Sequence, residues 1–196
     1  MMLPKKSLGQ HFLTDRNIAA KIAASLSGFG GYTHLLEAGP GMGALTIFLL
    51  NETNYAYHGI EIDGEAVKYL ERQHPGAHFV HADLLKCDLG KIAPPPFALI
   101  GNFPYNISSQ ILFKILDNRD DIPEVVGMFQ EEVAQRICAA PGSKTYGILS
   151  VLTAAFYDVE YLFPVSEKVF RPRPRVQSAV MRLRRNTLNE PDCDPL

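Results

Sequence analysis

The chain has 196 residues and a formal net charge of −2, with 46% apolar and 20% charged residues. This composition is typical of one globular domain and argues against a disordered or collagen-like chain. No apolar run reaches 18 residues and the N-terminus has no apolar secretory segment, so we expect neither a membrane span nor a signal peptide. Cys87, Cys138 and Cys193 lie far apart, which indicates neither a disulfide framework nor a metal site and suits a cytoplasmic protein.

The basic residues are unevenly distributed. Seven of the 19 lysines and arginines lie in residues 168–185, a stretch that contains no acid. Such a local concentration can supply phosphate contacts to a nucleic acid even though the whole chain is slightly acidic. A solvated basic surface without a partner is the alternative.

Strand-like and helix-like segments alternate along the chain. Asp15 is the expected N-cap of a first helix. The further elements expected in chain order are a strand at 34–38, a helical run at 44–50, a strand at 55–61, a helix after Asp63, strands at 77–81 and 97–101, a helix with an apolar face at 107–116, a strand at 125–129, a helix at 130–139, and strands at 157–163 and 178–183.

This alternation predicts an α/β fold with a mostly parallel sheet covered by helices on both faces. No long helix separates the last two strands, so we expect them to form an antiparallel edge. Residues 186–196 are polar and contain two prolines, which is typical of a linker or a chain end.

A glycine-rich loop, Gly39-Pro-Gly41-Met-Gly43, lies between the strand at 34–38 and the following helical run, and Glu37 precedes it. Glycine permits a tight turn and a close approach to a ligand, and the helix start behind it offers free N–H groups. A dinucleotide site favours the spacing G-x-G-x-x-G. Here the third glycine comes one residue early, which is the pattern of S-adenosylmethionine-dependent methyltransferases. A dinucleotide site and a purely structural turn are the alternatives.

Two acids follow the next strands. Glu61 closes a strand 20 residues after Gly41, where a carboxylate can accept hydrogen bonds from both hydroxyls of a ribose. Asp83 follows the strand at 77–81 and could accept a bond from the adenine amine of the same cofactor. Taken alone, an acid at position 83 is equally typical of a helix cap or a loop. With Gly39 and Glu61 it completes a predicted nucleoside pocket.

The segment Gly101-Asn-Phe-Pro-Tyr-Asn106 follows the strand at 97–101, and therefore opens onto the same crevice. It suits methylation of an exocyclic base amine, whose lone pair is delocalised into the ring. The Asn102 side-chain carbonyl and the Pro104 backbone carbonyl can accept its two N–H bonds and aim the lone pair at the methyl group. Tyr105 can stack on the ring. A structural turn is the alternative, since Asn and Pro are common turn residues.

The late segment 169–176 is basic and is stiffened by two prolines. Phe170 could close the face of the base opposite Tyr105. A lone aromatic residue is also typical of a core position.

These residues together resemble one family, the ribosomal RNA adenine N6-dimethyltransferases, whose bacterial member acts on small-subunit rRNA. The resemblance covers about residues 5–185 and is carried by the segments 6–13, 37–46, 61–63, 101–109, 130–133, 141–144, 146–147, 149–151, Phe170 and 176–180. The segment 6–13 and the Asn-x-Pro-Tyr motif are together highly specific.

The resemblance implies a Rossmann-like class I S-adenosylmethionine-dependent methyltransferase with a seven-stranded sheet. It implies transfer of two methyl groups to each of two adjacent adenosines in a hairpin loop near the rRNA 3′ end, during biogenesis of the small subunit. The expected partner is small-subunit rRNA or the assembling 30S particle, and the expected oligomeric state is a monomer. The residues implied to bind the cofactor are His11, Leu13, Gly39, Gly41, Glu61, Ile62, Asp83, Leu84 and Asn102, and those implied at the reacting base are Asn102, Pro104, Tyr105 and Phe170.

The sequence departs from the family pattern in places. Phe103 stands where the family usually has Leu, so its side chain is expected to point into the core and to shift the loop backbone slightly. Gln110 stands where Pro is frequent, with no functional effect expected. The family carries a small helical domain after the last strand, so we expect domain boundaries of 1–185 for the methyltransferase domain and 186–196 for a linker or the truncated start of the next domain.

Two other functions share parts of this pattern. An adenine-N6 DNA methyltransferase shares Asn-x-Pro-Tyr but normally has a target-recognition domain, and no segment of this chain suggests one. An RNA-binding assembly or transcription factor could keep the fold without the chemistry. The intact Asn102, Pro104, Tyr105 and Glu61 argue against lost catalysis.

Overall fold

The computed structural model describes Lys5 and residues 8–186. The strands are β1 Phe12–Leu13, β2 His34–Ala38, β3 Ala56–Glu61, β4 His78–His81, β5 Phe97–Asn102, β6 Glu124–Gln130, β7 Tyr157–Val165, β8 Phe170–Arg171 and β9 Ser178–Arg185. The helices are α1 Arg16–Ala23, α2 Thr46–Leu49, α3 Gly64–Gln73, α4 Ser108–Asp117, α5 Glu131–Ile137 and α6 Ile148–Phe156.

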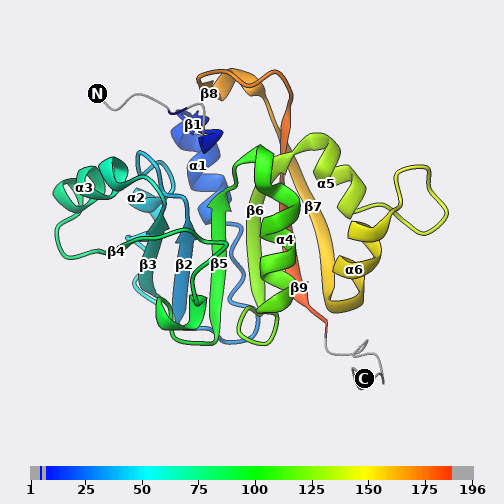
Figure 1. The fold of residues 1–196 in the computed structure, drawn as a ribbon, viewed down its shortest axis with the longest axis horizontal. Coiled ribbons are helices and arrows are strands. Elements are labelled where there is room, and N and C mark those ends of the chain that lie inside the picture. The colour runs from blue at the N-terminus through cyan, green and yellow to red at the C-terminus, as the bar shows by residue number, and fades with distance from the viewer. Residues whose placement is uncertain (1–4, 6–7, 187–196) are drawn as a thin grey trace.

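Seven strands form one sheet in the order β4-β3-β2-β5-β6-β9-β7. The pairs from β4 to β6 are parallel, whereas β9 runs antiparallel to both β6 and β7. The predicted seven-stranded, mostly parallel sheet and its antiparallel edge are therefore confirmed. Figure 1 shows the sheet nearly face-on, with β4 at one side and β7 at the other.

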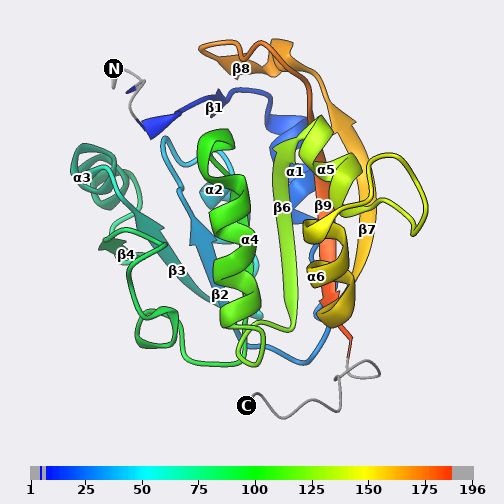
Figure 2. The ribbon, with the colours of Figure 1, turned by 45° about the vertical axis from the view of Figure 1, so that its right-hand side comes forward.

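Helices cover both faces of the sheet, as expected. β5 explains the arrangement, because alternate side chains point to opposite faces. Phe97 and Leu99 pack into the core cluster that includes residues of α4 and α5, while Ala98 and Ile100 pack into the cluster that includes α1 and α2. Figure 2 shows α4 in front of the sheet and α1 behind it. A strand buried on both sides must be continuously apolar, which the sequence of β5 satisfies.

Local capping places two helices where the sequence predicts them. The Asp15 carboxylate accepts hydrogen bonds from the N–H groups of Asn17 and Ile18 at the start of α1. The Asp63 carboxylate accepts a bond from Glu65 N at the start of α3. Both satisfy backbone donors that a helix start leaves free.

The sequence interpretation missed two features. Helix α6 precedes β7 directly, and its almost wholly apolar sequence shows no helical periodicity. A second, two-stranded sheet pairs β1 with β8, and in it Leu13 lies opposite Phe170, far away in the sequence. Figure 1 shows this small sheet above the carboxyl ends of the parallel strands.

Three histidines without an assigned role form a row across neighbouring strands. Nδ1 of His34 lies 3.0 Å from Nε2 of His58, and Nδ1 of His58 lies 2.9 Å from Nδ1 of His78. Burial and the two neighbouring rings lower the pKa of His58 to about 4, so the central ring is neutral at pH 7.

Within the described residues, no helix combines the length and the apolar character that crossing a membrane requires.

Candidate active site

A cavity opens at the carboxyl ends of β2 to β5, where parallel α/β sheets hold their ligands. All the predicted site residues except Phe170 line it, namely His11, Leu13, Gly39, Gly41, Glu61, Ile62, Asp83, Leu84, Asn102, Pro104 and Tyr105. The wall opposite the strand ends consists of residues 8–13, which we call the strap.

The glycine loop adopts backbone angles that side chains disfavour. Gly39, Gly41 and Gly43 have φ values of +68°, +57° and +81°. A Cβ built on Gly39 would meet no atom within 4 Å, so the cavity reaches this backbone directly. A Cβ on Gly41 would lie 3.1 Å from the ring of Phe12 in the strap. The glycines therefore serve ligand access and close packing together.

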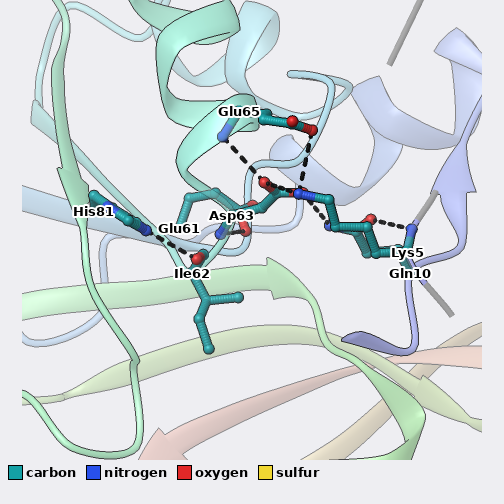
Figure 3. Close-up of polar contacts among 7 residues, drawn as sticks. All are labelled: Lys5, Gln10, Glu61, Ile62, Asp63, Glu65 and His81. Carbon is teal, nitrogen blue, oxygen red and sulfur yellow. Dashed lines mark hydrogen bonds and ion pairs between the residues drawn. The ribbon is translucent and has the colours of Figure 1, made fainter. Parts of the chain in front are cut away.

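Glu61 is fixed by two backbone donors. Gly41 N donates to Oε2 at 2.9 Å, and Asp63 N donates to Oε1 at 2.9 Å. Burial raises the pKa of this carboxyl although both bonds favour the charged form. Each oxygen keeps a second lone pair, so the carboxylate can still accept bonds from two hydroxyls. Figure 3 shows Glu61 beside Asp63.

A second carboxyl, Glu37, lies at the floor of the same cavity. It is fully buried and accepts bonds from Thr46 Oγ1 at 2.7 Å and from Tyr57 Oη at 2.5 Å. Burial raises the pKa of Glu37 to about 7. The sequence interpretation used this residue only as part of the loop pattern. Its position suits a cationic ligand, because no basic side chain neutralises it among the described residues.

Asp83 caps a turn and also lines the cavity, while its contact with the adenine amine stays a prediction. Its Oδ1 accepts a bond from Leu85 N at 3.0 Å, which caps the turn after β4, and its Oδ2 lies 3.5 Å from Nζ of Lys86. The residue also lines the cavity beside Leu84. The capping bond holds the carboxylate at the cavity edge.

Asn102 ends β5 with its amide oriented by the strap. Its Nδ2 donates to the backbone oxygen of His11 at 2.9 Å. This bond uses the donor side of the amide and leaves Oδ1 as the acceptor available to a ligand. The Pro104 carbonyl accepts a 3.3 Å bond from Ile107 N. Ser108 Oγ lies 3.5 Å from the same carbonyl oxygen but 3.1 Å from that of Tyr105, so its single proton favours Tyr105 and leaves Pro104 able to accept a further bond.

Tyr105 forms the outer wall of the cavity. Its hydroxyl hydrogen-bonds Ser178 Oγ at the start of β9, and its ring stacks on His11 with 5.5 Å between the centroids and 22° between the planes. Burial raises the pKa of its hydroxyl, which stays protonated at neutral pH. One face of the ring is thus already in contact with an aromatic group.

Phe170 is not brought together with these residues. Its side chain is 2% exposed and packs into the core cluster that contains Leu13, so it occupies the core position that a lone aromatic residue suggested. Its role at the reacting base stays a prediction.

Phe103 points into the core, as its departure from the family pattern suggested. It is 1% exposed, and its ring centroid lies 4.9 Å from that of Phe129. The space for the ring exists because residues 101 and 127 on two adjacent strands are glycines. Asn102 and Pro104 on either side still line the cavity.

The strap is held by contacts that the sequence did not reveal. Lys5, just before it, places Nζ 2.8 Å from Asp63 Oδ1 and 3.2 Å from Glu65 Oε2, and Gln10 accepts a bond from Lys5 N at 2.8 Å. Figure 3 shows this cluster over the start of α3. Although burial works in the opposite direction, the bond to Lys5 lowers the pKa of Asp63. No local pattern signals an attachment between residues 58 positions apart.

The basic stretch 168–185 divides into two separate surfaces. Arg182 and Arg185 lie toward the end of β9 remote from the cavity and pair with Glu160 at 2.6 Å and Asp120 at 3.6 Å. The segment 166–177, which we call the arm, connects β7 to β9 beside the cavity. The antiparallel course of β9 carries its arginines away from the site.

The donor set of the cavity fits S-adenosylmethionine. Two buried carboxyls with raised pKa values suit a ligand that carries positive charge, and Glu61 offers acceptors to a ribose. Glu61 and Asp83 would hold the nucleoside, and the open backbone at Gly39 would admit the amino-acid part.

Comparisons with known proteins agree with this assignment. The family model described as ribosomal RNA adenine dimethylase matches residues 1–194. Ribosomal RNA small subunit methyltransferase A of Cytophaga hutchinsonii is 55% identical over 192 residues, covering 97% of this chain and 74% of that protein. The protein of the same name from Parabacteroides distasonis is 55% identical over 196 residues, covering 99% and 73%.

Solved structures give the same picture. The 23S rRNA methyltransferase ErmE matches with a TM-score of 0.77 and 34% identity over 90% of this chain and 70% of that one. A dimethyladenosine transferase from Plasmodium falciparum matches with a TM-score of 0.80 and 27% identity over 90% and 64%.

The sheet order, the glycine loop and the carboxylates of the cavity define a class I methyltransferase that uses S-adenosylmethionine. Within that class, the family model that matches residues 1–194 identifies the family. The chain belongs to the ribosomal RNA adenine dimethylase family.

Proposed function

We propose that this enzyme transfers methyl groups from S-adenosylmethionine to N6 of two adjacent adenosines in a hairpin loop near the 3′ end of small-subunit (16S) rRNA. The observation that carries the proposal is the orientation of Asn102, whose amide donor is engaged by His11 O while its acceptor stays available at the cavity. The name that the relatives share, ribosomal RNA small subunit methyltransferase A, supports the choice of RNA.

The residues of the cavity act on the amine by position rather than by covalent chemistry. Oδ1 of Asn102 and the carbonyl of Pro104 accept the two N–H bonds of the target amine, which favours a pyramidal nitrogen with its lone pair aimed inward. Tyr105 stacks on the adenine ring, worth about 1–3 kcal/mol per base. When bound, S-adenosylmethionine supplies an electrophilic methyl group on its sulfonium. Catalysis then rests on alignment and on hydrogen bonds to the amine.

Flipping the adenosine out of its stack costs a few kcal/mol, and less in a loop than in a duplex. His11 stacks on one face of Tyr105, so the base takes the remaining face or displaces His11. We assign Phe170 to the second face of the base, which requires its side chain to leave the core contacts it makes here.

The residues proposed to contact the cofactor are His11, Leu13, Gly39, Gly41, Glu61, Ile62, Asp83, Leu84 and Asn102.

The proposal also covers the state of the rRNA substrate, the oligomeric state of the protein and its domain boundaries. We infer that a cytoplasmic monomer acts on small-subunit rRNA, either free or within the assembling 30S particle. Residues 1–185 form the methyltransferase domain, since β9 ends at Arg185. Residues 186–196 form a linker or the start of a further domain and lie almost wholly outside the described residues.

Labelled methyl transfer tests the proposal. Small-subunit particles that lack the modification, naked 16S rRNA and adenine-containing DNA are compared as acceptors, with Asn102→Ala as the inactive control. We expect label at two adjacent adenosines of the particle. Preferred labelling of DNA would favour the DNA methyltransferase, and binding of particles without any labelling would favour an assembly factor.

A further inference from the structure

A second groove adjoins the cofactor cavity on the side of Tyr105. It is lined by Gly9, His11, Tyr105, Asn106, Gln130, Pro174, Arg175 and Val176. Gly9, His11 and Tyr105 line both spaces, so the groove begins where the target base would enter. A nucleic acid chain that places one nucleotide against Tyr105 must continue past this wall.

The arm that forms the outer side of the groove is fixed at both ends. Near its start, Val169 O accepts bonds from Thr14 N at 2.8 Å and Thr14 Oγ1 at 2.9 Å, and the pairing of β1 with β8 follows. At its other end, Gln177 O accepts a 2.9 Å bond from Glu131 N. The Pro172 carbonyl in its middle lies 2.7 Å from His11 Nδ1. Its side chains therefore project from a fixed backbone, which limits the entropy lost on binding.

The charge of the arm suits a phosphate. Residues 166–177 contain four basic residues and one acid, and that acid, Glu167, pairs with Arg173. Arg171 and Arg175 are exposed, and no carboxylate of the described residues lies within ion-pair distance of either. Arg175 lines the groove itself, next to Val176, whose side chain is 45% exposed. A cation beside exposed apolar surface matches the phosphate and the base of a nucleotide.

We propose that this groove binds the nucleotide next to the target adenosine, with the Arg175 guanidinium on its phosphate and Val176 against its base. The proposal rests on the proposed function, because Tyr105 must hold the target. When two adjacent adenosines are modified, the groove holds the second adenosine during one of the two reactions. Arg175 is thus a substrate-positioning residue outside the cofactor site.

Binding of a short hairpin RNA with two adjacent loop adenosines, titrated with salt, tests the groove. The variants are Arg175→Ala, Arg175→Lys and, as a matched control, Arg184→Ala, which removes an arginine pairing with Glu160 at the far end of β9. Loss of one phosphate contact lowers the slope of log affinity against log salt by about 0.7 for a single-stranded loop. We expect this decrease for Arg175→Ala with roughly ten-fold weaker binding at low salt, an unchanged slope for Arg175→Lys, and wild-type behaviour for Arg184→Ala.

Affinity for S-adenosylmethionine, measured in parallel, is expected to be equal in all four proteins. The proposal that the groove binds RNA is contradicted if Arg175→Ala and Arg184→Ala show the same RNA affinity and the same salt slope. It is also contradicted if Arg175→Ala weakens cofactor binding as much as RNA binding. These readouts do not depend on turnover. If the wild-type protein binds the hairpin through Arg175 but methylates no rRNA, the proposed function is contradicted, whereas RNA binding in the groove is still supported.

Discussion

Gly127 on β6 lies outside the cavity, but a methyl group added there should still affect the reaction, because it would crowd the buried ring of Phe103. A Cβ built there would lie 2.3 Å from Cε2 of Phe103 and 2.7 Å from Cε2 of Phe129. Both rings are fully buried, so neither can move aside into solvent. We expect Gly127→Ala to cost about 1–3 kcal/mol through overpacking. This exceeds the roughly 0.4–1 kcal/mol that Gly→Ala can contribute by restricting the unfolded chain.

The functional consequence follows from the neighbours of Phe103. We expect the ring to yield by displacing the backbone between Asn102 and Pro104, the two residues proposed to accept bonds from the target amine. Gly127→Ala should therefore lower kcat more than it weakens cofactor binding. Glu61, which is proposed to bind the cofactor, lies on a different strand.

A double-mutant cycle isolates this steric cause. Phe103→Leu shortens the side chain and alone should cost roughly 1 kcal/mol as a large-to-small core substitution. Combined with Gly127→Ala, the smaller side chain frees the space that the methyl group needs, so the double variant should be more stable than the sum of the single effects by about 1 kcal/mol or more. Urea unfolding of the four proteins gives the coupling, and kcat should recover with it. Additive free energies, or a fully stable Gly127→Ala, would refute the packing argument.

Five further variants at four positions separate binding, chemistry and folding. Glu61→Ala should weaken S-adenosylmethionine binding by about 1–3 kcal/mol in calorimetry, because charge-assisted bonds are lost, and unchanged affinity would exclude its ribose role. Asn102→Ala should reduce the methylation rate far more than cofactor affinity, whereas equal losses would make it a mere cofactor ligand. Tyr105→Ala should impair methylation more than Tyr105→Phe, because the ring face carries the contact, and equal defects would remove the stacking argument. His58 has a folded pKa of about 4, below the value near 6.5 of an unfolded histidine. The unfolded chain therefore takes up the proton first, and stability should fall as pH drops from about 6.5 toward 4. Urea unfolding at pH 7 and pH 5 should show a smaller loss for His58→Gln, and equal losses would contradict the reasoning.

Much of the fold could be predicted because its signals are local. The apolar strands, the caps at Asp15 and Asp63 and the glycine loop each act within a few residues. The site followed from topology, since parallel strands bring Glu61 and Asn102 to one edge of the sheet. Helix α6 escaped detection because a nearly uniform apolar sequence has no polar face to give it a period.

The contacts that escaped prediction are long-range. Leu13 pairs with Phe170 through a two-residue strand, which is too short to show any alternation. The same pairing buries Phe170, so sequence alone could not decide between core and base contact. The arginines at 171–175 and 182–185 look continuous in the sequence, but β9 carries the second group to the opposite edge of the sheet.

Lys5 and the strap that follows it explain why so much of the specific resemblance lies in the first residues of the chain. Lys5 binds Asp63, whose N–H fixes Glu61, while His11 O fixes the amide of Asn102. Lys5 and the strap therefore orient both the carboxylate proposed to bind the cofactor and the amide proposed to accept a bond from the target amine. Changes in the strap should alter cofactor affinity and catalytic rate together. Changes at Arg175, which contacts neither group, should alter RNA binding alone, so the two effects can be told apart on the same protein.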